Sequence, residues 1–279
     1  MVDYGDVVRG KAPMTTTDPT RFGTIPAAAV ISACLSAQAT VPPRSGVARL
    51  FGRSPLSTES RPWYVGAIGE LRVADRLARL GPVWTTLHSV PIGERGSDID
   101  HVVVGPAGVF TVNTKFHDDA RVWVGGKRIL VNGQKTDHLR NSRFEAQRVR
   151  KLLTEVLPDQ VPVHAVLVFV GTRSITIRER PDDVAVVREA ELVRWLNRRR
   201  AVLDDDQRGR VASALSRRDT WVAHPEPATE PDLRRFDDLR REVGAAHRVR
   251  MLWGAGLIAG SLAAMGAFAL NALGSLLGM

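Results

Sequence analysis

The chain of 279 residues has a single cysteine, Cys34, so no disulfide can form within it. Aromatic residues make up only 6% of the chain, and tyrosine occurs twice. Neither a cysteine-based zinc finger nor an aromatic-rich RNA-binding signature is present, so no base-reading motif identifies a preferred nucleic acid. Lysine is also scarce: the chain has 5 lysines and 34 arginines.

Charge is absent from the last 29 residues, Met251 to Met279. About 20 apolar residues suffice to cross a bilayer, which predicts a transmembrane helix over residues 251–274. A long buried helix of a globular core is the alternative. Arginines at 240, 241, 248 and 250 come just before this segment. The positive-inside rule therefore predicts a single-pass protein of the cell membrane, with a C-terminal anchor and a cytoplasmic main domain.

Gly256 and Gly260 are spaced as in the small-xxx-small pattern of closely packed membrane helices. We therefore expect a homodimer through this face. A segment so rich in glycine and alanine also produces this spacing by chance.

The formal net charge is +9 and the sequence pI is about 10.6. Such a balance favours a polyanionic partner, which is either nucleic acid or an acidic membrane surface. The excess of arginine over lysine also fits biased coding, which would carry no functional meaning.

Four regions follow from composition. Residues 1–60 are rich in Thr, Pro, Ser, Gly and Arg, and we expect most of them to form a flexible lead-in. Residues 62–200 hold the main domain, and residues 201–250 form a charged helical region with a proline-rich linker. The apolar segment at 251–274 completes the chain.

Periodicity predicts the elements of the main domain. Apolar residues recur every three positions from Val65 to Leu80, which indicates a helix that ends at Gly81-Pro82. Strands are expected over 83–90, 99–104 and 109–112, followed by a hairpin over 122–131 that extends the sheet. A helix over 144–157 and a buried strand over 163–170 follow. The predicted fold is α/β, with an αβββαβ core around a central mixed sheet.

The hairpin of residues 99–112 has polar residues at one end. Asp98 and Asp100 begin its first strand, while Asn113 and Lys115 end the second. Antiparallel pairing brings these side chains to one edge of the sheet, where their oxygens suit a hard divalent cation. The alternative is that they are ordinary solvated strand ends. The nearby His117-Asp118-Asp119 is read as a loop rather than as metal ligands.

The segment from Asp100 to Lys115, DHVVVGPAGVFTVNTK, resembles the core of the nuclease-related domain (NERD) family. That family has an Asp before a short apolar strand, Gly-Pro-x-Gly at the turn and Glu-x-Lys on the next strand. The resemblance extends from about Trp63 to Leu153. It implies the fold of the PD-(D/E)xK restriction-endonuclease-like nucleases and metal-dependent cleavage of nucleic acid.

The resemblance implies a role for each matching residue. Glu70 becomes a helix-borne acid that faces the site, Asp100 the principal metal ligand and Lys115 the residue that orients water. Gln147 becomes a supporting polar residue on the following helix. Asn113 departs from the pattern because it stands where the family has Glu, which weakens the binding of Mg²⁺ or Mn²⁺ by Asp100, Asn113 and Glu70.

Two classes of function follow. The first is a membrane-tethered nuclease that hydrolyses DNA or RNA with a divalent metal. The second is a non-catalytic module of the same fold, which binds nucleic acid or a protein at the membrane after losing turnover through Asn113. A third reading assigns the positive charge to anionic lipid beside the anchor.

Overall fold

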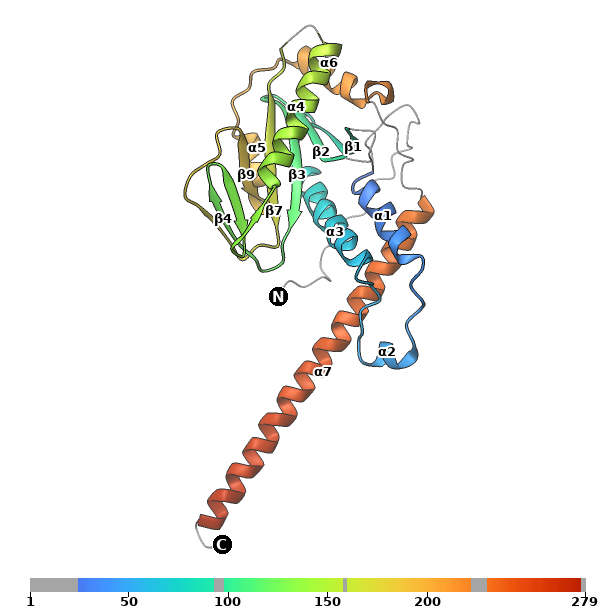
Figure 1. Ribbon diagram of the computed structural model, residues 1–279, viewed down its shortest axis with the longest axis vertical. Helices are drawn as coiled ribbons and strands as arrows, with labels where there is room; N and C mark the ends of the chain where they lie inside the picture. Colours follow the sequence, from blue (N-terminus) through green and yellow to red (C-terminus); the bar gives the residue numbers. More distant parts are fainter. Residues whose placement is uncertain (1–24, 93–97, 158–159, 222–229, 277–279) are drawn as a thin grey trace.

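The computed structural model describes residues 25–92, 98–157, 160–221 and 230–276 (Figure 1). Its centre is a five-stranded sheet in the order β1-β2-β3-β7-β9. The first three strands pair antiparallel and the last three pair parallel, so the sheet is mixed. The strands are β1 (Thr85–Pro91), β2 (Asp98–Gly105), β3 (Gly108–Phe116), β7 (Val163–Val170) and β9 (Val184–Arg188).

Helices cover both faces of this sheet. Val103, Phe110 and Val112 pack on the side of α3 (Ser60–Leu77) and α5 (Leu192–Asn197), whereas Val102 and Val104 pack on the side of α4 (His138–Val156). Burial on both faces explains why β2, β3 and β7 are almost continuous apolar runs. The order α3-β1-β2-β3-α4-β7 confirms the predicted αβββαβ core.

The hairpin after β3 does not extend the central sheet, contrary to the sequence prediction. It belongs to a separate four-stranded sheet in the order β6-β5-β4-β8. The physical reason is that β7 already occupies the free edge of β3, so β4 pairs in parallel with β8 instead. The strands are β4 (Arg121–Gly125), β5 (Arg128–Val131), β6 (Gln134–Thr136) and β8 (Ser174–Ile177).

The N-terminal region contains more structure than a flexible lead-in. Its apolar run forms α1 (Ala28–Gln38), and a short helix, α2 (Gly46–Leu50), follows. Ile31 and Cys34 of α1 are buried in a cluster with α3 and α7, which explains why a segment without helical periodicity is nevertheless helical. Residues 1–24 lie outside the described part.

The C-terminal region is one continuous helix, α7 (Glu230–Leu276), that projects from the body (Figure 1). Its charged first part packs on the body through Phe236 and Leu239, while residues 251–268 are exposed throughout. The helix is long and apolar enough to cross a membrane. Before it come α6 (Asp205–Ser216) and two short 3-10 helices, Glu189–Glu191 and Arg218–Thr220.

Candidate active site

The polar ends of β2 and β3 lie side by side. His101 pairs with Val112 in the antiparallel register, so Asp100 is level with Asn113. Since side chains alternate along a strand, Asn113 and Lys115 share the α4 face of the sheet with Asp98 and Asp100. The four side chains therefore lie together at one sheet edge, as the sequence predicted.

Asp100 is held in place by the neighbouring strand. Its carboxylate Oδ2 accepts a hydrogen bond of 2.5 Å from the backbone N–H of Thr114. Burial raises the pKa of Asp100, while Lys115 and the Thr114 N–H oppose this shift because they stabilise the ionised form. Burial and the charge of Asp100 also raise the pKa of Asp98 to about 7.

Glu70 reaches the same place from α3. The preceding Gly69 packs against β3 so closely that a Cβ there would lie 3.0 Å from Cβ of Phe116. This close approach brings Glu70 to the strand ends, where its side chain is buried. Burial raises the pKa of Glu70 well above its ordinary value; Asp100 and Asp98 add to the shift, and Lys115 opposes it.

Glu145 on α4 is a site residue that the sequence reasoning missed. Its carboxylate Oε1 accepts a hydrogen bond from the side-chain amide of Asn113, and both side chains are buried. Burial, reinforced by Asp100, raises the pKa of Glu145 to about 8. The sequence does contain a sign of this role, because Glu145 is an acid on the apolar stripe of α4, one turn before Val149.

Gln147, by contrast, is exposed on α4. Residues two apart on a helix point in very different directions, so Glu145 and Gln147 cannot both face β3. The helix position that meets the strand ends is therefore 145 rather than 147. From here, "strand-end cluster" denotes Glu70, Asp98, Asp100, Asn113, Lys115 and Glu145.

The strand-end cluster offers the type of oxygen ligands that divalent cations bind. Four of its buried oxygens have no hydrogen-bond partner: Glu70 Oε2, Asp98 Oδ2, Asn113 Oδ1 and Glu145 Oε2. Carboxylate and amide oxygens are the ligands of hard cations such as Mg²⁺ and Mn²⁺. Across the described ranges, however, no group of three or more His, Cys, Asp or Glu side chains is already arranged to hold a metal.

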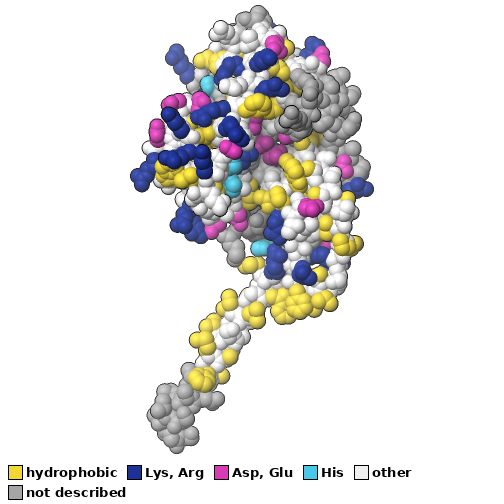
Figure 2. Space-filling model, in the orientation of Figure 1, with side chains coloured by type: hydrophobic (Ala, Val, Ile, Leu, Met, Phe, Trp, Pro, Cys, Tyr) yellow, Lys and Arg dark blue, Asp and Glu magenta, His cyan; other side chains and the backbone are white. Residues whose placement is uncertain are grey.

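Two histidines stand beside Lys115. Nε2 of His117, just after β3, lies 3.2 Å from Nε2 of His138, at the start of α4. Burial lowers the pKa of both, to about 4 for His138, and the charge of Lys115 acts in the same direction. Both rings are therefore neutral at pH 7. Figure 2 shows histidine, acidic and basic side chains together in a hollow of the body's surface.

Comparison with known families finds a similarity for this domain. Residues 65–170 match the family model of the nuclease-related domain. Over these residues the chain is similar to the nuclease-related domain family. The match spans α3 to β7 and so contains the whole strand-end cluster, which confirms the resemblance noted in the sequence. Comparison with curated proteins and with solved structures finds no match to this chain.

Proposed function

We propose that the nuclease-related domain is a metal-dependent phosphodiesterase that cleaves DNA or RNA. The observation that carries the proposal is the strand-end cluster. It gathers four carboxylates, an amide and a lysine at one sheet edge, within the segment that matches the family. Acids with raised pKa values that surround one lysine are typical of a reactive site, because a purely structural arrangement gains nothing from crowding like charges.

Mg²⁺ or Mn²⁺ would be held by Asp100, Glu70 and the amide oxygen of Asn113. Glu145 would add the carboxylate that β3 lacks, because its hydrogen bond to Asn113 brings it to the same position. When bound, the cation supplies charge stabilisation at the phosphoryl oxygen and acidifies water.

The chain's own residues then divide the remaining tasks. The Lys115 ammonium orients the attacking water and offsets the negative charge that develops on the phosphate. Asp98, whose pKa is about 7, is suited to accept a proton from that water near neutral pH. The backbone N–H of Thr114 keeps the Asp100 carboxylate directed into the site.

A second candidate is a non-catalytic module that binds nucleic acid. Asn113 favours it, because an uncharged residue replaces the Glu of the family motif. The two candidates differ in turnover and not in affinity for nucleic acid.

We further propose that α7 tethers the domain to the cell membrane. Residues 251–268 are exposed and uncharged, and arginines precede them. By the positive-inside rule the domain would lie on the cytoplasmic side.

The deciding experiment is a nuclease assay of the purified full chain with Mn²⁺ or Mg²⁺ on single- and double-stranded DNA and RNA. Lys115→Ala should lower the rate at least about 100-fold while nucleic-acid binding is kept. Lys151→Ala is the matched control, since Lys151 is exposed on α4 and pairs with Glu155. Cleavage by Lys115→Ala at the wild-type rate would refute the mechanism. Binding without cleavage by the wild type would favour the second candidate.

A further inference from the structure

A patch of large apolar side chains is exposed where α7 leaves the body. Val47, Leu50 and Phe51 have 67%, 59% and 54% of their surface exposed, and Trp253 has 47%. We call residues 46–52 together with Trp253 the foot. Figure 2 shows hydrophobic side chains gathered at this point, with Lys or Arg side chains directly above them. Contiguous apolar surface of this kind marks an interaction site.

The foot is attached to α7 at the level where the uncharged segment begins. The rings of Phe51 and Trp253 stack with centroids 5.6 Å apart, and Nε1 of Trp253 donates a hydrogen bond of 2.8 Å to the Leu50 carbonyl. Gly52 has a φ of +63°, and a Cβ there would lie 2.6 Å from the Ala246 carbonyl oxygen. Glycine therefore lets the foot lie directly on the α7 backbone.

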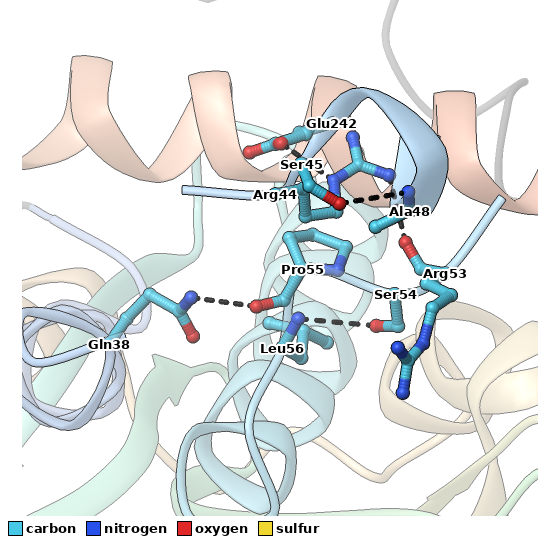
Figure 3. A network of polar contacts seen from close by, with 9 residues as sticks. All are labelled: Gln38, Arg44, Ser45, Ala48, Arg53, Ser54, Pro55, Leu56 and Glu242. Atoms are coloured by element: carbon cyan, nitrogen blue, oxygen red, sulfur yellow. Dashed lines mark hydrogen bonds and ion pairs between the residues drawn. The ribbon is translucent and has the colours of Figure 1, made fainter. Parts of the chain in front are cut away.

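Polar contacts behind the foot fix its shape (Figure 3). Arg44 pairs with Glu242 of α7 at 2.8 Å and donates to the Arg53 carbonyl, so it bridges the two sides of the loop. Ser45 caps α2 by accepting from the N–H of Ala48. Gln38 donates to the Pro55 carbonyl, which joins the loop to α1. The apolar side chains thus project from a braced loop.

The two segments that form the foot and the α7 surface beside it carry charges of one sign. Residues 39–58 contain no Asp or Glu, and neither do residues 243–279. Arg49, Arg53, Arg248 and Arg250 are exposed on the two segments. Basic residues beside apolar and tryptophan side chains are the pattern of a segment that lies in the interface of an anionic bilayer.

We propose that the foot enters the headgroup region of the same bilayer that α7 crosses. This proposal rests on the proposed membrane tether. It gives the domain a second point of attachment, so that its orientation on the membrane is set by the foot as well as by the helix. The occupant is anionic lipid, because the apolar patch is continuous with the apolar segment of α7 and surrounded by arginines.

The test measures the depth of labels on the full chain in vesicles of phosphatidylcholine and phosphatidylserine. In a Cys34→Ala background, an environment-sensitive dye is placed at Leu50→Cys, at Leu262→Cys in α7, or at Gln134→Cys in β6. We expect spin-labelled lipid to quench the dyes at 50 and 262, and aqueous iodide to quench only the dye at 134.

Each other outcome overturns the proposal in its own way. If iodide quenches the dye at 50 as it does at 134, while lipid quenches the dye at 262, the tether holds and the foot stays in water. If lipid fails to quench the dye at 262, α7 is not inserted and the tether fails with the foot. If the dye at 50 is shielded from both quenchers, protein covers the patch, such as a second copy of the chain.

Charge reversal tests the choice of anionic lipid. Arg49→Glu together with Arg53→Glu should reduce lipid quenching at 50 by at least half. Arg121→Glu together with Arg128→Glu, two exposed side chains on strands of the second sheet, is the matched control with the same change in net charge. Equal quenching in both double variants, or equal quenching in vesicles of phosphatidylcholine alone, would contradict a role for anionic headgroups.

Discussion

The side-chain amide of Asn113 donates a hydrogen bond to the carboxylate of Glu145 and so joins the end of β3 to α4. The strand position at which the family has an acid is an amide here, and the acid stands on the facing helix. A carboxylate therefore lies beside this strand position, but α4 supplies it rather than β3.

Swapping the residue types at positions 113 and 145 tests whether Glu145 takes over the role of an acid on β3. Glu145→Gln is expected to lower metal-dependent cleavage about 10- to 100-fold, because it removes a carboxylate beside Asp100. The double variant Asn113→Glu/Glu145→Gln should recover most of the loss, since it returns the carboxylate to the strand. Steady-state rates with Mn²⁺ check this. A double variant no better than the single one would show that the two positions are not equivalent.

The strand-end cluster should make the metal-free protein less stable as the pH rises above 6.5. Asp98 and Glu145 have pKa values of about 7 and about 8 in the fold, above their ordinary values of 3.8 and 4.5. The folded state therefore binds more protons than the unfolded state, and the free energy of unfolding falls by about 1.4 kcal/mol per pH unit for each extra proton.

Histidines with lowered pKa values act in the opposite sense, but only below their ordinary pKa of 6.5. The fall should therefore be visible between pH 6.5 and 8 in urea unfolding with EDTA, followed by tryptophan fluorescence in detergent. Glu145→Gln should make the slope shallower because it removes one titrating group. An unchanged slope in that variant would contradict the assignment of Glu145.

Added Mn²⁺ should raise the melting temperature more at pH 8 than at pH 6.5. A cation requires ionised carboxylates, and binding to the folded state alone stabilises it. Asp100→Asn should abolish the shift, whereas Asp118→Asn, an exposed acid outside the cluster, should keep it. Calorimetric melting curves with and without Mn²⁺ measure both effects. A shift of equal size at the two pH values would argue against the buried carboxylates as ligands.

Two glycines of α3 should respond in opposite directions. A Cβ at Gly66 meets nothing within 4 Å, so Gly66→Ala should stabilise the helix by about 0.5–1 kcal/mol. Gly69→Val should destabilise by about 1–3 kcal/mol, because its side chain would press on Phe116 and Thr114 and move Glu70 away from the strand ends. Urea unfolding measures both. Equal effects would mean that α3 is not closely packed on β3 at Gly69.

Cys34 should be inert in the folded protein. Its side chain is buried, and burial raises the pKa of the thiol to about 11, so little thiolate forms at pH 8. A thiol reagent such as Ellman's reagent should react only after urea is added, while the exposed Gln134→Cys reacts at once. Rapid reaction of Cys34 in the native protein would show that α1 opens readily.

The local sequence pattern is sufficient to predict those helices and strands whose apolar residues recur at a regular spacing. The apolar stripe from Val65 to Leu80 and the β-branched runs of β2, β3 and β7 predicted the core, and the turn between β2 and β3 placed Asp100 near Asn113. The hairpin of β4 and β5 was recognised, but its sheet was not. Pairing between distant strands depends on which edge is free, and β7 arrives later in the chain.

The sequence by itself determined the αβββαβ order, the polar strand ends and the uncharged C-terminal segment, because each depends on neighbouring residues. Only the tertiary structure decided that Glu145 and not Gln147 meets Asn113, since the rotation of α4 on the sheet is set by packing. It also decided that α1 is a packed helix and that residues 46–52 lie against Trp253, about 200 residues away in the chain. Contacts between segments so far apart arise from burial and shape complementarity, which no local period records.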